Sequence, residues 1–216
     1  WEKLSHVSVK GAEYDSRERQ PHPRRLEGSW VDLTNCVHAL LDDQEKNRLI
    51  WLHGAAGVGK SAVAFNVAER MKDLRTRKET INEKRLAGSF VFSRKHTKRS
   101  TTGYFFATLA YQLASTYPSI RSDTRGCIQS NPSLLDPDKS LRDQMDALFL
   151  QPLRMLRFRL NGCLPLVFVV DALHECTSKA ELADLISLLA QVLHKPDLPV
   201  IHILLTSNSQ THIREA

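Results

Sequence analysis

The chain has 216 residues and a mass of 24.5 kDa, which is enough for one sizeable hydrophobic core but not for two full domains. Hydrophobic residues make up 42% and charged residues 25%, the apolar runs are shorter than the roughly 20 residues of a membrane span, and neither end resembles a cleaved secretory segment. We therefore expect a cytoplasmic protein without a membrane span. The net charge of +6 suits nucleic acid, an anionic membrane or a nucleotide, but the basic segments 72–85 and 93–99 lack interleaved aromatic residues, which argues against nucleic acid.

The first 45 residues are expected to form an N-terminal arm and a short helix ahead of a core that spans 46–216. Residues 1–30 mix many charges with Pro21 and Pro23, which favours an extended arm over a core element. From Val31 the apolar residues follow helical spacing, so a short amphipathic helix should precede the first strand. The four cysteines lack the spacing of zinc ligands, so we expect reduced, mostly buried thiols at Cys36, Cys127, Cys163 and Cys176.

Apolar strand-like runs alternate with segments of helical period along the core. The expected strands are 48–53, 86–94, 165–173 and 198–207, and the expected helical segments are 60–74, 102–117, 139–158 with a break near Pro152, and 179–194. Such alternation predicts an α/β fold, a three-layer sandwich with a mostly parallel central sheet covered on both sides by helices.

A glycine-rich stretch connects the first strand to the next helix. Residues 54–61 read Gly-Ala-Ala-Gly-Val-Gly-Lys-Ser and match the phosphate-binding pattern G-x-x-x-x-G-K-[ST] in its required strand-to-helix context. Glycines let successive backbone amides point at an anion, and the helix adds its positive end. Lys60 is expected to reach the β and γ phosphates and Ser61 to bind Mg²⁺. The predicted nucleotide-binding residues are Gly54, Ala55, Ala56, Gly57, Val58, Gly59, Lys60, Ser61 and Ala62.

Two acidic residues lie at and just after the end of the buried run "LVFVVD". Asp171 ends that run, where a strand would deliver the second ligand of the metal, although an aspartate there can also be a cap or turn residue. Glu175 is the best placed residue to orient or deprotonate an attacking water, and a first-turn helix glutamate is the plain alternative. Together with Ser61, these are the candidate metal and catalytic residues.

In P-loop proteins of the additional-strand type, a further strand lies between the P-loop strand and the metal-carboxylate strand. Its polar end can sense the terminal phosphate. In this chain that end carries Thr206, Ser207 and Asn208, and an ordinary strand exit rich in turn-forming residues is an equally good reading.

Taken together, the segments "LIWLHGAAGVGKSAVA", "GSFVFSR", "FFATLAYQLA", "LVFVVDALHEC" and "ILLTSN" resemble the NACHT nucleotide-binding domain of fungal STAND-class signal-transduction NTPases, which are related to innate immune receptors of the NLR type. The resemblance implies a P-loop NTPase that binds ATP or GTP with Mg²⁺. It also implies a switch between a resting diphosphate state, with ADP or GDP, and a triphosphate state that assembles with other receptor subunits. The helical and winged-helix subdomains that follow the sensor strand in that family are absent from this sequence.

Two residues depart from the family pattern. His174 stands where the family usually has an aspartate, and imidazole is a poor ligand for Mg²⁺. Asn208 stands where the family usually has an arginine, so no cation is brought to the γ-phosphate there. We therefore expect nucleotide binding to survive these changes better than hydrolysis, which we expect to be slow.

Three other functions remain open at this point. The chain could be a hydrolysis-deficient oligomerisation module with nucleotide as a structural ligand. His174 and Asn208 favour this alternative. A small-molecule kinase shares the loop motif and could use 93–99 as a lid, and a nucleic-acid motor would suit the charge. The sequence does not distinguish adenine from guanine, and the arm before Trp30 is expected to form part of the base pocket.

Overall fold

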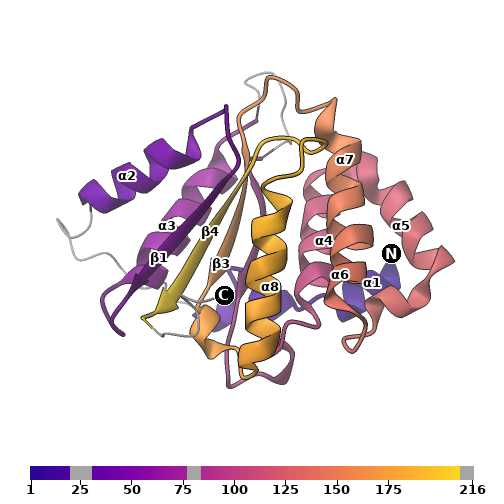
Figure 1. Ribbon diagram of the computed structural model, residues 1–216, viewed down its shortest axis with the longest axis horizontal. Coiled ribbons are helices and arrows are strands. Elements are labelled where there is room, and N and C mark those ends of the chain that lie inside the picture. Colours follow the sequence, from indigo (N-terminus) through magenta and orange to yellow (C-terminus); the bar gives the residue numbers. More distant parts are fainter. Residues whose placement is uncertain (20–30, 77–83, 210–216) are drawn as a thin grey trace.

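A parallel sheet of four strands forms the centre of the computed structural model, which describes residues 1–19, 31–76 and 84–209 (Figure 1). The strands are β1 (Arg48–Gly54), β2 (Leu86–Val91), β3 (Leu166–Asp171) and β4 (Ile201–Asn208), and their spatial order is β1-β4-β3-β2. Every pairing between neighbours is parallel, so all four carboxyl ends lie at one edge of the sheet. The predicted strands are confirmed, and β4 lies between β1 and β3 as the sequence predicts.

Helices cover both faces of the sheet, which gives three layers (Figure 1). Alternate residues of β3 face opposite sides. Val167 and Val169 pack in one core with α2 (Val31–Leu41) and α3 (Lys60–Asp73), whereas Phe168 and Val170 pack in a second core with α4 (Phe105–Thr116) and α8 (Lys179–Val192). All six residues of β3 are buried, because this central strand is covered on both faces.

The segment 139–158 contains the expected helical irregularity. It consists of α6 (Leu141–Gln144), a π-helical segment η6 (Met145–Leu150) and α7 (Gln151–Arg157). Pro152 lies in the first turn of α7, where a missing N–H is tolerated. The wider π turn directly before it accommodates the proline ring, which would clash with a regular preceding helical turn. Helix α5 (Arg121–Ser130) was not predicted, because it is polar and buries only Thr124 and Ile128, which leaves its sequence with a weak apolar period.

Short helical turns connect the main elements: η1 (Lys10–Ala12), η2 (Arg17–Arg19), η3 (Thr97–Arg99), η4 (Pro118–Ile120), η5 (Pro132–Leu135) and η7 (Leu173–Glu175). Cys163 and Cys176 are buried, Cys127 is half-buried and Cys36 is exposed, and all four are free thiols, so the expectation of mostly buried thiols holds for two of them. None of the described helices combines the length and the hydrophobicity that a membrane crossing requires.

The expectation of an extended N-terminal arm is wrong for residues 1–19. Helix α1 (Glu2–Val7) packs against α4, and Leu4 and Ala12 are fully buried in the core. The Trp1 ring stacks on Tyr111 with ring centroids 5.0 Å apart. Because these few apolar residues are spaced irregularly among charges, their burial left no periodic signal. Pro21, Pro23 and Trp30 lie outside the described residues, as does the base pocket predicted near them.

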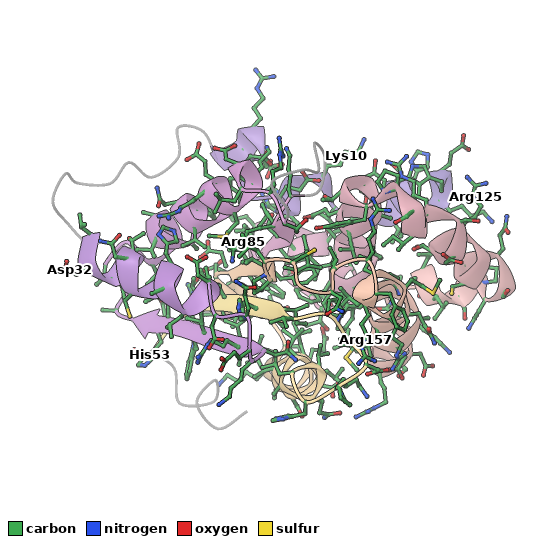
Figure 2. All side chains as sticks on the ribbon, turned by 90° about the horizontal axis from the view of Figure 1, so that it is seen from above. Lys10, Asp32, His53, Arg85, Arg125 and Arg157 are labelled. Atoms are coloured by element: carbon green, nitrogen blue, oxygen red, sulfur yellow. The ribbon has the colours of Figure 1, made fainter. Side chains whose placement is uncertain are left out.

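Arg85 is the largest charged side chain in the interior and joins α2 to the sheet. Its guanidinium donates to the Asp42 carboxylate at 2.6 Å, to the Leu41 carbonyl and to the Pro165 carbonyl at 3.3 Å, which satisfies a charge that is only 1% exposed. The side chains of Lys10, Arg125 and Arg157, which Figure 2 labels, are exposed and come from three separate parts of the chain. The positive charge therefore includes a buried structural cation as well as scattered surface groups.

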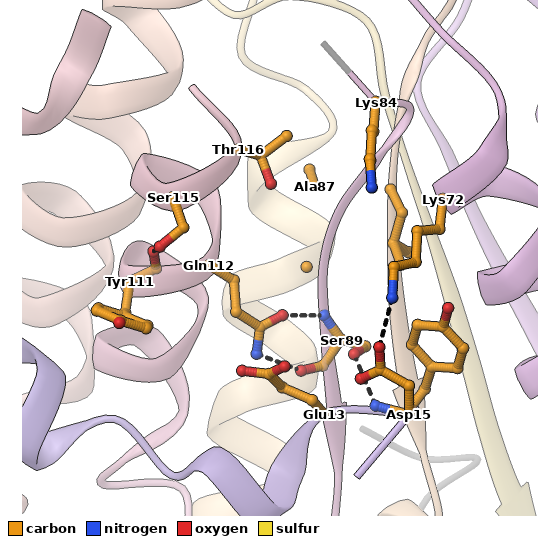
Figure 3. A pocket seen from close by; sticks show the side chains of 13 residues that line it. Glu13, Asp15, Lys72, Lys84, Ala87, Ser89, Tyr111, Gln112, Ser115 and Thr116 are labelled. Atoms are coloured by element: carbon orange, nitrogen blue, oxygen red, sulfur yellow. Dashed lines mark hydrogen bonds and ion pairs between the residues drawn. The ribbon is translucent and has the colours of Figure 1, made fainter. Parts of the chain in front are cut away.

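Side chains cover β2, one of the two edge strands of the sheet (Figure 3). The Ser89 backbone N–H donates to Gln112 Oε1 at 2.7 Å, and Gln112 Nε2 donates to the Ser89 carbonyl at 2.9 Å, so one amide side chain replaces a neighbouring strand. Ser89 Oγ accepts from the Tyr14 backbone N–H at 3.0 Å. Beside it lies a cavity of about 210 Å³, where Lys72 and Asp15 form an ion pair at 2.5 Å. The edge is thus protected by α4 and the N-terminal segment.

Replacing Gln112 with alanine should lower the free energy of unfolding by about 1–3 kcal/mol, because two backbone groups of Ser89 lose their partner. Urea denaturation measures the change. Gln129→Ala, at an exposed position of α5, is the matched control and should change the free energy by less than about 0.5 kcal/mol. Equal effects of the two substitutions would contradict this account of the edge.

His202 makes the fold sensitive to acid. It is fully buried in β4, its Nε2 donates to the Asp43 carbonyl at 2.8 Å, and Nδ1 has no hydrogen-bond partner among the described residues. Burial lowers the pKa of His202 below its usual value of 6.5, an effect that Arg85 reinforces and the bond to Asp43 opposes. The unfolded chain therefore binds the proton more readily than the folded one.

We expect stability to be full above about pH 6.5 and to fall as the pH drops below it, by at most about 1.4 kcal/mol per pH unit for this one histidine. Urea unfolding at about pH 8 and about pH 5.5 measures the loss. His202→Gln keeps a donor for the Asp43 carbonyl but cannot titrate, so its loss should be smaller than that of the wild type. An identical pH dependence in the two proteins would rule out His202 as the cause.

Candidate functional site

The glycine-rich loop lies at the carboxyl edge of the sheet, between β1 and α3. Gly57 and Gly59 have φ angles of 80° and 92°, in the left-handed region that favours glycine, so this sequence can curl where most residues would be strained. Residues 55–58 are exposed, and α3 begins directly after the loop, at Lys60. The positive end of a helix of 14 residues therefore faces an accessible, curled backbone, an arrangement that attracts anions.

Lys60 folds back into this loop. Its Nζ donates to the Gly54 carbonyl at 3.0 Å and to the Ala55 carbonyl at 2.6 Å, and the residue is only 9% exposed. Burial lowers the pKa of the Lys60 ammonium, while the nearby negative charge of Asp171 acts in the opposite direction. Among the described residues, the hydrogen bonds of this ammonium go to neutral carbonyls, which an anionic ligand could replace.

Asp171 and Ser61 meet although 110 positions separate them in the sequence. Ser61 Oγ donates to Asp171 Oδ1 at 3.1 Å, and Thr206 Oγ1 donates to the same oxygen from β4. Asp171 is 2% exposed, so its carboxylate depends on these hydroxyl donors. Residues from α3, β3 and β4 thereby converge on one oxygen atom.

Thr206 also fixes the backbone after Asp171. Its Oγ1 accepts from the Ala172 backbone N–H at 3.0 Å, and Ala172 has a φ of 59°, the one positive φ recorded for a described residue other than glycine. A left-handed alanine is strained and persists where its surroundings hold it. The Thr206 hydroxyl thus holds the carboxylate and the turn that leads to η7 in a single arrangement.

His174 links η7 to the end of β4. The Asn208 backbone N–H donates to His174 Nδ1 at 3.2 Å, and His174 Nε2 lies 3.6 Å from Glu175 Oε1. Burial is the main cause that lowers the pKa of His174, with Lys60 and Arg94 acting in the same direction and Glu175 and Asp171 opposing them. The neutral ring therefore accepts at Nδ1 and carries its proton at Nε2, on the side of Glu175.

The three residues predicted to sense a terminal phosphate have different neighbours. Thr206 contacts Asp171, as described above, whereas Ser207 Oγ accepts from Trp51 Nε1 at 2.9 Å and donates to the Asn208 carbonyl at 3.0 Å. Neighbouring residues of a strand point to opposite faces, which separates Thr206 from Ser207. Asn208 takes part through its backbone, in the bond to His174.

Arg94 is a site residue that was not predicted from the sequence. Its backbone N–H donates to Glu175 Oε2 at 3.2 Å, and its guanidinium donates to the His174 carbonyl at 2.5 Å. The available signal was its position just after β2, because a strand that neighbours β3 must end beside η7. Strand order is a tertiary property, so the sequence alone could not place the basic segment 93–99 beside η7.

The site combines the Lys60 ammonium, the exposed backbone amides of the glycine-rich loop and hard oxygen ligands. Ser61 Oγ and Asp171 Oδ1, 3.1 Å apart, are the ligand types that Mg²⁺ prefers, and Mg²⁺ commonly uses one or two protein ligands and completes its shell with water and phosphate. No cluster of three or more His, Cys, Asp or Glu residues suited to a metal occurs within 1–19, 31–76 and 84–209. These residues therefore fit a metal that arrives together with a polyphosphate.

Comparison with known proteins gives one family match. A family model described as nephrocystin 3, N-terminal, matches residues 27–208, which is more than half of the chain and includes the glycine-rich loop, Asp171, Glu175 and the end of β4. No curated protein matches the chain significantly. The matching family is not the NACHT family, so the NACHT resemblance stays a hypothesis.

Proposed function

The chain belongs to the nephrocystin 3, N-terminal family, and from this premise and the geometry of the site we propose that it binds a purine nucleoside triphosphate, ATP or GTP, with Mg²⁺ and hydrolyses it slowly. One observation carries the proposal: Ser61 and Asp171 meet at 3.1 Å beside a glycine-rich loop that contains Lys60. A fold that binds no polyphosphate has no need for a serine, a buried aspartate and a lysine to come together at the end of the sheet.

Each part of the site has a defined task in binding. The amides of 55–59 and the amino end of α3 receive the phosphates, and Lys60 exchanges its loop carbonyls for phosphate oxygens. Ser61 and Asp171 would hold Mg²⁺, which when bound neutralises phosphate charge. Thr206 acts as a positioning residue because it holds the Asp171 carboxylate. Of the two bound states, the diphosphate is the proposed resting one.

Glu175 is the proposed group that orients or deprotonates the attacking water. Its two carboxylate oxygens face the Arg94 backbone N–H at 3.2 Å and His174 Nε2 at 3.6 Å, so it is held at the carboxyl edge of the sheet without being fully buried. A general base of this kind contributes about 10²–10⁴-fold to a rate. The task requires an ionised carboxylate within reach of a water on the γ-phosphate.

The alternative function is a nucleotide-binding oligomerisation module that does not hydrolyse its ligand. The side chains at positions 174 and 208 favour it, because the His174 ring is a neutral acceptor where the NACHT pattern has a carboxylate, and Asn208 brings no cation where that pattern has an arginine. In either case we propose that the chain is the nucleotide core of an NLR-like cytoplasmic receptor that assembles with further subunits.

Lys60→Ala should weaken binding of the triphosphate by about 10- to 100-fold, because a charge-assisted hydrogen bond contributes about 1.5–3 kcal/mol. Isothermal titration with Mg-ATP and Mg-GTP measures the affinity and identifies the base. Lys3→Ala, at an exposed position of α1, is the matched control and should bind like the wild type. Unchanged affinity in Lys60→Ala would refute the assignment of the site.

Phosphate release distinguishes the slow enzyme from the non-hydrolysing module. The double substitution His174→Asp, Asn208→Arg should raise turnover, by up to about 10³-fold where the new arginine reaches the transition state. Glu175→Gln should remove about 99% or more of the wild-type turnover. A wild-type rate equal to that of buffer supports the module, and a rate that the double substitution leaves unchanged contradicts the role given to positions 174 and 208.

A further inference from the structure

The end of β2 lies directly beside the site. Pairing between β2 and β3 continues one residue beyond β2, since the Phe92 backbone N–H donates to the Asp171 carbonyl at 3.0 Å. Residues 93 and 94 therefore run alongside 172–175. This placement follows from strand order alone and puts an arginine next to the metal-binding end of β3.

The loop that carries Arg94 is firmly anchored at its base. The Ser93 backbone N–H donates to the Arg99 carbonyl at 2.9 Å and closes the loop. Arg99 is 4% exposed, and its guanidinium donates to the Gly11 carbonyl at 2.8 Å and to Glu18 Oε2 at 2.6 Å. The backbone of Arg94 is thus held in place, while its side chain is exposed.

The Arg94 guanidinium has unused binding capacity. Within the described part of the chain its one hydrogen bond goes to the neutral His174 carbonyl, and no carboxylate of the described residues lies within ion-pair distance of it. Guanidinium offers five N–H donors in a planar fork that matches two oxygens of a phosphate. A single carbonyl satisfies little of that fork.

The contacts of η7 place this cation near the proposed phosphate site. Arg94 donates to the carbonyl of His174, which follows Asp171 by three residues, and Asp171 accepts from Ser61 in the first turn of α3. Asp171 and Ser61 are the residues proposed to hold the metal, so Arg94 lies on the turn that begins at this metal site. Asn208, by contrast, brings no cation to this place.

We propose that Arg94 makes the site select triphosphate over diphosphate, by turning its guanidinium from the His174 carbonyl to the terminal phosphate. The inference rests on the proposed function of the site. A diphosphate has no γ-phosphate for the fork to grip, so Arg94 stays on His174 in that state. The Arg94 backbone bond to Glu175 is unaffected by substitution of the side chain, which separates this role from that of Glu175.

The test compares the Kd of a non-hydrolysable Mg-triphosphate analogue with that of the Mg-diphosphate for wild type, Arg94→Ala, Arg94→Lys and Lys95→Ala. We expect Arg94→Ala to weaken triphosphate binding about tenfold or more and diphosphate binding less than about threefold. Arg94→Lys, which keeps the charge but loses the fork, should lie in between. Lys95→Ala removes the neighbouring exposed cation and should match the wild type.

Two outcomes would overturn the inference while leaving the proposed function intact. An equal, clear loss of both affinities in Arg94→Ala would show that the residue acts only through the shape of η7, and unchanged affinities for both nucleotides would show that its side chain takes no part in binding. A wild-type chain that binds neither nucleotide would instead overturn the proposed function, and the inference with it.

Discussion

The site depends on the buried carboxylate of Asp171, at the end of β3. Asp171 is nearly inaccessible, and removing such a charge from water is costly unless hydrogen bonds compensate. Hydroxyls from Ser61 and Thr206 supply that compensation from two other elements. These bonds hold the first residues of α3 against the ends of β3 and β4. Because the glycine-rich loop leads directly into α3, the same bonds fix its position.

The same edge of the sheet is connected to the N-terminal segment. Arg99 reaches from the loop after β2 to Gly11 and Glu18, and Arg94 in that loop contacts η7. A change at the proposed phosphate site that moves Arg94 would act on a loop whose other end holds the N-terminal segment. Hydrogen bonds thus connect η7, beside the proposed site, with residues 11–18.

The two departures from the NACHT pattern act together in the structure. The His174 ring accepts from the backbone N–H of Asn208, a bond that any residue but proline could donate at position 208, and this bond attaches η7 to the end of β4. The two side chains supply neither the carboxylate nor the cation of that pattern. Under the proposed function, this lack of charge fits slow hydrolysis and leaves Arg94 as a nearby cation.

The sequence by itself determined the strands, most of the helices and the glycine-rich loop, because each is encoded by neighbouring residues: an unbroken apolar run at 166–171, helical spacing at 179–192, and glycines at the positive φ angles of Gly57 and Gly59. Only the tertiary structure decided that Leu4 is buried, that Gln112 closes the β2 edge and that Arg94 reaches η7. Those contacts join residues far apart in the chain, and a pair of distant residues has no period or spacing from which it could be read before the strand order is known.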